Sequence, residues 1–169
     1  MDDDPTYDIA IVRETGSGER ELIADAPLKK AITATLRRHN TPAAIISVAL
    51  VDDLRIAELN RRHLGHDGPT DVLAFDLRDA ADQDDSNGDG FLRGELEGDV
   101  VISVETAMRE ARRRGHEPDA EVALYAVHGI LHLLGYDDHQ DRDAARMHVV
   151  EDEILASVGW GPVFKAEPK

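Results

Sequence analysis

The residues best suited to chemistry lie in the segment 128–139, which reads HGILHLLGYDDH. His128 and His132 are four residues apart, so a helix would place both imidazoles on one face. Gly135 can end that helix in a left-handed conformation, and the turn that follows can bring residues 137–139 back toward the imidazoles. Two helical imidazoles and a third ligand from such a turn are typical of a zinc site with an open position, which supports hydrolysis near neutral pH.

Histidines at this spacing are often ordinary core or surface residues, so the surroundings of the pair decide. The segment 122–134 is apolar on nearly every side, which predicts a buried helix. Burying two unpartnered imidazoles there would cost about 1–3 kcal/mol each, and a metal ion would satisfy both. We therefore predict one divalent metal ion, with Zn²⁺ as the expected ion, although imidazoles also suit nickel, cobalt and copper.

The composition is that of a soluble globular protein. The chain has 169 residues, 41% of them hydrophobic and 32% charged, which predicts a single domain over residues 1–169 with loose termini at 1–6 and 160–169. There is no cysteine, so metal ligands must be His and carboxylates. No apolar run is long enough to cross a membrane, and the N-terminus is acidic rather than basic, so we expect a cytoplasmic location.

The net charge of −16 is unusual for a protein that binds nucleic acid. Such binding draws most of its strength from Lys and Arg at phosphates. A local basic patch can still dominate, because charges are screened beyond about 8 Å at physiological salt. The candidate patches are Arg61 with Arg62, and the run 112–114, although a charge run is more often a solvated face.

Hydrophobic periodicity and turn residues predict four strands and five helices. The expected strands span 7–13, 44–51, 71–77 and 98–102, and the expected helices span 25–40, 52–65, 104–115, 118–134 and 141–158. The segment 78–96 reads as an exposed hairpin connection. Its residues 85–96 resemble a calcium loop, but Leu96 stands where that loop needs Glu, so we interpret it as solvated. The order predicts an α+β fold, a small mixed four-stranded sheet packed with about five helices and the metal site on a central helix.

Three blocks of the sequence resemble the bacterial YbeY family. They are the segment 128–139, the segment 60–75 with its PTDVLAF end, and GDVVIS at 98–103, in family order. The resemblance implies a single-domain α+β fold with a zinc-type three-histidine site. It also implies a single-strand-specific endoribonuclease that acts in 16S rRNA 3′-end maturation and ribosome quality control, so its partners would be single-stranded rRNA precursor and the small ribosomal subunit, and we expect no DNA partner.

The metal-site block departs from the family pattern by one residue. The family has five residues between its second and third His, whereas six residues separate His132 from His139 here. Asp138 therefore occupies the spacing of the third ligand. Because a turn absorbs an extra residue more easily than a helix does, the expected ligands are His128, His132 and His139. Asp138 remains a chemically sound oxygen ligand.

The second block also departs from the family. Leu64 stands where the family usually has Arg, and His63 where it has Tyr. If that Arg holds a phosphate in the family, another group must do so here. Arg61 and Arg62 are the predicted substrate-binding residues, and His66 lies close to them in sequence.

Two other functions compete with RNA cleavage. Gly129 stands where zinc peptidases of the H-E-x-x-H type carry the Glu that acts as general base, so a metallopeptidase would lack its usual proton carrier. The glycine could equally allow another segment, or a substrate, to come close. A non-catalytic ribosome-associated metal-binding module would need four protein ligands. No general acid or base is assigned from the sequence; Asp137 or Asp138 could serve, or could instead orient a histidine.

Overall fold

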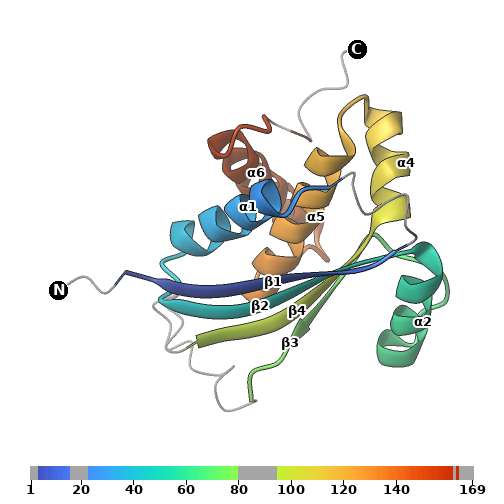
Figure 1. Cartoon of the computed structure of the whole chain (residues 1–169), viewed down its shortest axis with the longest axis horizontal. Helices are drawn as coiled ribbons and strands as arrows, with labels where there is room; N and C mark the ends of the chain where they lie inside the picture. The colour runs from blue at the N-terminus through green and yellow to red at the C-terminus, as the bar shows by residue number, and fades with distance from the viewer. Residues whose placement is uncertain (1–3, 16–22, 80–94, 162, 164–169) are drawn as a thin grey trace.

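A mixed four-stranded sheet forms the centre of the molecule (Figure 1). The computed structural model describes residues 4–15, 23–79, 95–161 and 163. Across the sheet the strands run in the order β1, β2, β4, β3; β1, β2 and β4 are parallel, and β3 is antiparallel to β4. Their bounds are Thr6–Glu14 (β1), Ala43–Val51 (β2), Val72–Asp76 (β3) and Glu95–Ser103 (β4).

Five helices of the described part of the chain surround this sheet. They are α1 (Asp25–Arg38), α2 (Asp53–Leu64), α4 (Val104–Arg114), α5 (Pro118–Leu133) and α6 (Asp141–Ser157). Helices α1 and α5 lie on one side of the sheet with α6 beyond them, and α2 lies on the other side (Figure 1). The predicted fold class, α+β with a mixed four-stranded sheet and five helices, is confirmed.

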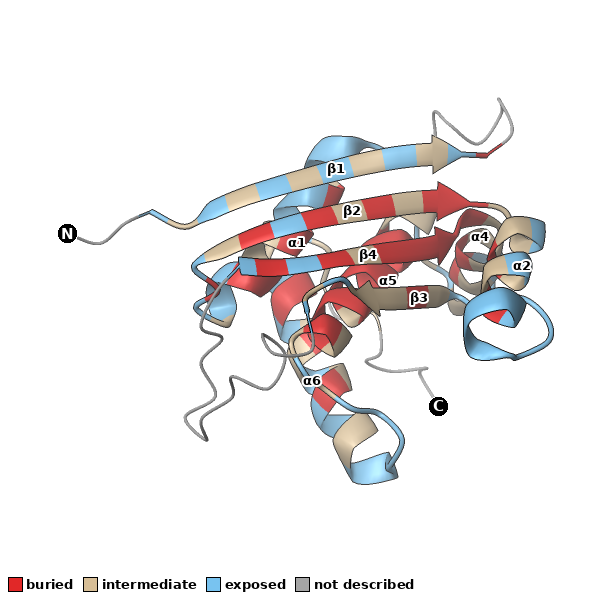
Figure 2. Ribbon diagram, turned by 90° about the horizontal axis from the view of Figure 1, so that it is seen from below, coloured by how far each residue is buried: buried red, intermediate tan, exposed pale blue. Residues whose placement is uncertain are grey.

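Helix α5 is buried on almost every side, as its continuous apolar sequence predicts. It packs on β4 and β3 and against α1, α4 and α6 (Figure 2). Two glycines allow this close packing. A Cβ on Gly98 would lie 2.5 Å from Leu133 Cδ1, and a Cβ on Gly129 would lie 2.7 Å from Val100 Cγ1. The sequence suggested that Gly129 allows another segment to come close, and that segment is the sheet.

Helices α2 and α4 both begin at a residue whose side chain caps the helix. Asp52 caps α2 by accepting a hydrogen bond from the Arg55 amide at 2.8 Å. Ser103 ends β4, caps α4, and also donates its hydroxyl to Asp53 at 2.5 Å. The last residue of GDVVIS thus joins β4, α2 and α4.

The main difference from the sequence-based boundaries is at the start of β4. The strand begins at Glu95, three residues earlier than Gly98, and Leu96 is fully buried in it. The rest of the calcium-like segment lies outside the described residues. At the termini expected to be loose, Thr6 already belongs to β1 and Trp160 packs against the core. The extent of a single domain over the whole chain stays a prediction. Among the described helices, none is both long and apolar enough to span a membrane.

Candidate metal centre

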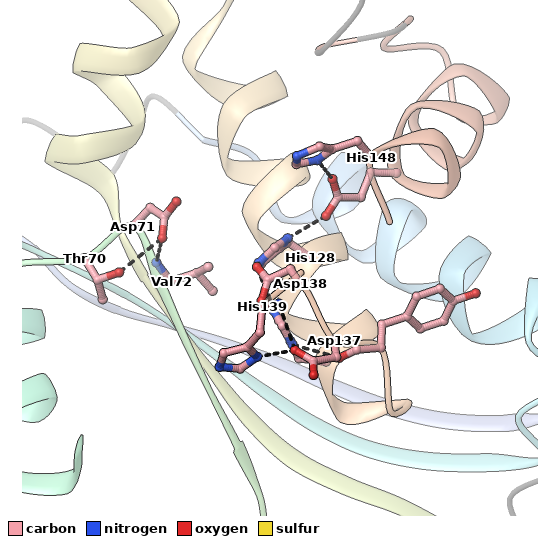
Figure 3. A network of polar contacts seen from close by, with 11 residues as sticks. Thr70, Asp71, Val72, His128, Asp137, Asp138, His139 and His148 are labelled. Carbon is pink, nitrogen blue, oxygen red and sulfur yellow. Dashed lines mark hydrogen bonds and ion pairs between the residues drawn. The ribbon is translucent and has the colours of Figure 1, made fainter. Parts of the chain in front are cut away.

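His128 and His132 face each other at the end of α5 that leads into the turn toward α6. Figure 3 shows His128 there, with Asp138 of the turn close by. Their Nε2 atoms lie 3.0 Å apart, and their rings meet edge to face with centroids 4.6 Å apart. Both side chains are partly buried. The shared helix face predicted from the spacing is thus present.

The other nitrogen of each ring is already engaged. His132 Nδ1 lies 3.0 Å from the Tyr136 carbonyl oxygen, and His128 Nδ1 lies 2.6 Å from Glu151 Oε1. A carbonyl can only accept a hydrogen bond, so His132 carries a proton on Nδ1. An ionised Glu151 likewise accepts from His128. In the neutral form, both imidazoles therefore present an unprotonated Nε2.

This pairing calls for a cation between the rings. Two neutral imidazoles in this tautomer offer only lone pairs at Nε2, and two acceptors 3.0 Å apart cannot hydrogen-bond to each other. Either a proton or a metal ion must lie between them. Burial alone would lower the pKa of His128, but the hydrogen bond to Glu151, its charge and that of Asp138 raise this pKa above the ordinary value. Two Nε2 lone pairs with the Asp138 carboxylate beside them also form a donor set that fits a divalent metal ion.

The turn after α5 supplies the candidate third ligand. Asp138 Oδ2 lies 3.5 Å from His128 Nε2 and 3.6 Å from His132 Nε2, and these three residues form a group that could hold a metal ion. His139 is 85% exposed and pairs with Asp137, in a second group that also includes Asp138. Asp138 is thus the turn residue that the structure groups with both imidazoles. Assignment of His139 as third ligand stays a prediction.

The turn itself is held from two sides. Gly135 adopts a positive φ of 98°, which ends the helix as expected from its residue type. The Tyr136 hydroxyl lies 2.9 Å from His39 Nε2 at the end of α1, and the Tyr136 amide donates to the Leu131 carbonyl at 3.0 Å. These contacts fix the backbone carbonyl that accepts from His132.

Glu151 contacts the candidate metal centre, and the sequence reasoning missed it. It lies on α6, its side chain is 0% exposed, and its carboxylate contacts both His128 and His148. The sequence did contain a signal for its burial. Glu151 follows Met147 by four residues and precedes Ile154 by three, so the three residues share the buried face of α6. A carboxylate within that buried stripe requires a partner in the core.

Comparison with known proteins decides the family. A family model described as Endoribonuclease YbeY matches residues 17–159. The chain belongs to the YbeY endoribonuclease family.

Curated YbeY relatives match most of the chain. The Endoribonuclease YbeY of Moorella thermoacetica is 42% identical over 149 residues, covering 80% of this chain and 92% of the relative. That of Frankia alni is 34% identical over 158 residues, covering 94% and 85%. A solution structure of a Thermotoga maritima protein matches with a TM-score of 0.54 and 25% identity, covering 95% of this chain and 97% of that one.

The predicted substrate-binding arginines lie on the exposed surface of α2. Arg61 and Arg62 are exposed in the last turn of α2, and the structure gives neither an ion-pair partner among the described residues. Leu64 stands at the position of the usual YbeY Arg. It is 53% exposed, so its side chain does not form part of the hydrophobic core. His63 packs edge to face on Phe75 of β3, with ring centroids 5.3 Å apart. The substrate-binding role of Arg61 and Arg62 stays a prediction.

Proposed function

We propose that this chain is a metal-dependent endoribonuclease that cleaves single-stranded RNA and acts in 16S rRNA 3′-end maturation and ribosome quality control. The observation that carries the proposal is the pair of Nε2 atoms 3.0 Å apart, each on a ring whose Nδ1 is already engaged. Membership of a family of endoribonucleases supports RNA as the substrate. The proposed cellular context is the cytoplasm, with the small ribosomal subunit as partner.

His128 and His132 are the two proposed ligands from the helix. The third comes from the turn, where the short distances favour Asp138, whereas the sequence analysis predicted His139. A divalent ion, with Zn²⁺ as the expected one, would lower the pKa of a water molecule and polarise a phosphodiester oxygen. The chain's own residues hold the ligand rings, because Glu151 and the Tyr136 carbonyl fix each Nδ1.

The geometry argues against the two alternative functions. At Gly129 a side chain would press onto Val100 of the sheet, so this position cannot present a general base as the H-E-x-x-H peptidases do. A structural zinc site is closed by four protein ligands. Among the described residues, the group that includes both helical histidines has only one further member, Asp138, which favours an open position.

The proposal is tested by RNA cleavage with controlled metal content. Native protein, chelator-treated protein and treated protein with Zn²⁺ restored are incubated with a single-stranded RNA, a duplex RNA and an unstructured peptide. We expect cleavage of the single-stranded RNA only, lost on chelation and regained with metal. A His128→Ala/His132→Ala variant should be inactive throughout, whereas Glu153→Gln on the surface of α6 should match the native protein. Equal cleavage by the double variant would contradict the proposal.

A further inference from the structure

We propose that Glu151 and His148 are positioning residues for the metal centre, forming a chain of contacts His148–Glu151–His128 that fixes the ligand ring from the side of α6. This inference rests on the proposed metal site, because it concerns how one ligand of that site is held. It assigns a role to two residues of α6 that lie outside the three family-like sequence blocks.

The carboxylate of Glu151 is engaged through both of its oxygens. Oε1 lies 2.6 Å from His128 Nδ1 on α5, and Oε2 lies 3.0 Å from His148 Nδ1 on the preceding turn of α6. Figure 3 shows the dashed contacts of the labelled His128 and His148 meeting at one carboxylate, which is that of Glu151. No part of the Glu151 side chain is exposed, so these hydrogen bonds replace those that water would supply.

A carboxylate in this place sets which nitrogen of His128 is available. It requires a proton on Nδ1, so the lone pair of Nε2 faces His132 and Asp138. The same hydrogen bond fixes the plane of the ring and makes Nε2 a stronger donor to a metal ion. Loss of such a partner usually lowers metal affinity by about 10–100-fold.

His148 orients the Glu151 carboxylate, as Glu151 in turn orients the His128 ring. Its side chain is 42% exposed, so it borders both solvent and the buried carboxylate. The spacing of three residues on α6 brings its Nδ1 onto Oε2, and this contact orients the carboxylate group. Without it, Glu151 could rotate away from the position that serves His128.

A purely structural role is the competing explanation. Glu151 joins α6 to α5, and a buried polar link of this kind stabilises a fold whether or not a metal is bound. The two roles differ in what they change. A structural link changes the stability of the metal-free protein, whereas a positioning residue changes metal affinity and the geometry of the bound ion.

The experiment measures the affinity of the full chain for Co²⁺ by competition with a chelating dye, the visible absorption of bound Co²⁺, and the melting temperature of metal-free protein. The variants are Glu151→Gln, Glu151→Ala, His148→Asn and His148→Ala. Glu153→Gln is the matched control, because it makes the same chemical change on the same helix in an exposed side chain.

We expect Co²⁺ affinity to fall about tenfold in Glu151→Gln, which keeps an acceptor, and about a hundredfold in Glu151→Ala. His148→Ala should weaken binding less, and His148→Asn should restore it, since an amide N–H can replace Nδ1–H. The Co²⁺ spectrum should change in both Glu151 variants and stay unchanged in Glu153→Gln.

Unchanged Co²⁺ affinity and spectrum in folded Glu151→Gln and His148→Ala, with only lower melting temperatures, would overturn the inference and leave a structural link. If Glu151→Ala does not fold, Glu151→Gln and the His148 variants still distinguish a positioning role from a structural link. Native protein that binds no Co²⁺ would overturn both this inference and the proposed function. Native protein that binds Co²⁺ but cleaves no RNA would overturn the function alone.

Discussion

Asp138 and His139 are adjacent, but the structure gives them very different surroundings. The spacing from His132 could not separate them, because one residue more or less in a turn is absorbed by backbone rotation. Their side-chain directions differ: Asp138 Oδ2 approaches both Nε2 atoms, while His139 pairs with Asp137 on the surface. The choice between the two is therefore a matter of affinity that single substitutions can measure.

We predict that Asp138→Ala weakens metal binding more than His139→Ala does. Removal of a direct ligand should exceed the roughly 10–100-fold loss typical of a group that only supports a ligand. Titration of each apoprotein with Zn²⁺ against a competing chelator gives the ranking. The reverse order would assign the third ligand to His139, as the sequence analysis predicted.

At the scale of elements, the proposed metal site would join the end of α5 to the turn that leads into α6. An ion that binds only the folded state raises the free energy of unfolding by about 4 kcal/mol at a thousandfold excess over Kd. We predict that chelation lowers the melting temperature of native protein.

The His128→Ala/His132→Ala variant serves as the control for this effect. Its melting temperature should be the same with and without chelator, measured by calorimetry. A native melting curve unaffected by verified metal removal would contradict the site.

The packing of α5 on β4 depends on Gly129. A Cβ there would lie 2.7 Å from Val100 Cγ1, so Gly129→Ala should overpack this contact. We expect the overpacking to lower the free energy of unfolding by about 1–3 kcal/mol. The higher helix propensity of Ala should offset about 1 kcal/mol of this loss. Urea denaturation measures the net loss. Val100→Ala should relieve the clash, so the double variant should be more stable than the sum of the two single losses predicts; strict additivity would argue against the close contact.

The elements that the sequence predicted well are those with long apolar runs or clear end signals. Helix α5 and strand β2 are apolar enough to be recognised directly, and glycines mark the ends of α2 and α4. The start of β4 was missed because Glu95 and Glu97 flank a single apolar residue, Leu96, so the segment reads like the polar loop before it. Glu151 was missed because its contact with His128 spans 23 residues and depends on how α6 packs on α5.

The molecule as a whole is strongly acidic, so RNA must be held by local groups. With a net charge of −16, long-range attraction cannot bring RNA to the surface, and binding should depend on a few phosphate contacts. Arg61 and Arg62 are exposed on α2 and, among the described residues, are not held in ion pairs.

We predict that Arg61→Ala/Arg62→Ala weakens RNA binding and flattens its dependence on salt, because each lost phosphate contact removes roughly one unit of slope. Fluorescence anisotropy across a salt series measures both quantities. Leu64→Arg is the complementary change and should raise affinity. If both variants bind like the native protein at every salt concentration, the substrate lies elsewhere on the surface.

The residues of the proposed metal centre are synthesised late during translation of the chain. The four described strands end at Ser103, whereas the helical ligands, the turn and Glu151 all follow in residues 128–151. The chain is synthesised from its N-terminus, and a domain generally folds as a unit. A nascent chain that has exposed only its sheet therefore holds no ligand, and the ability to cut RNA arises only after most of the polypeptide has left the ribosome that made it.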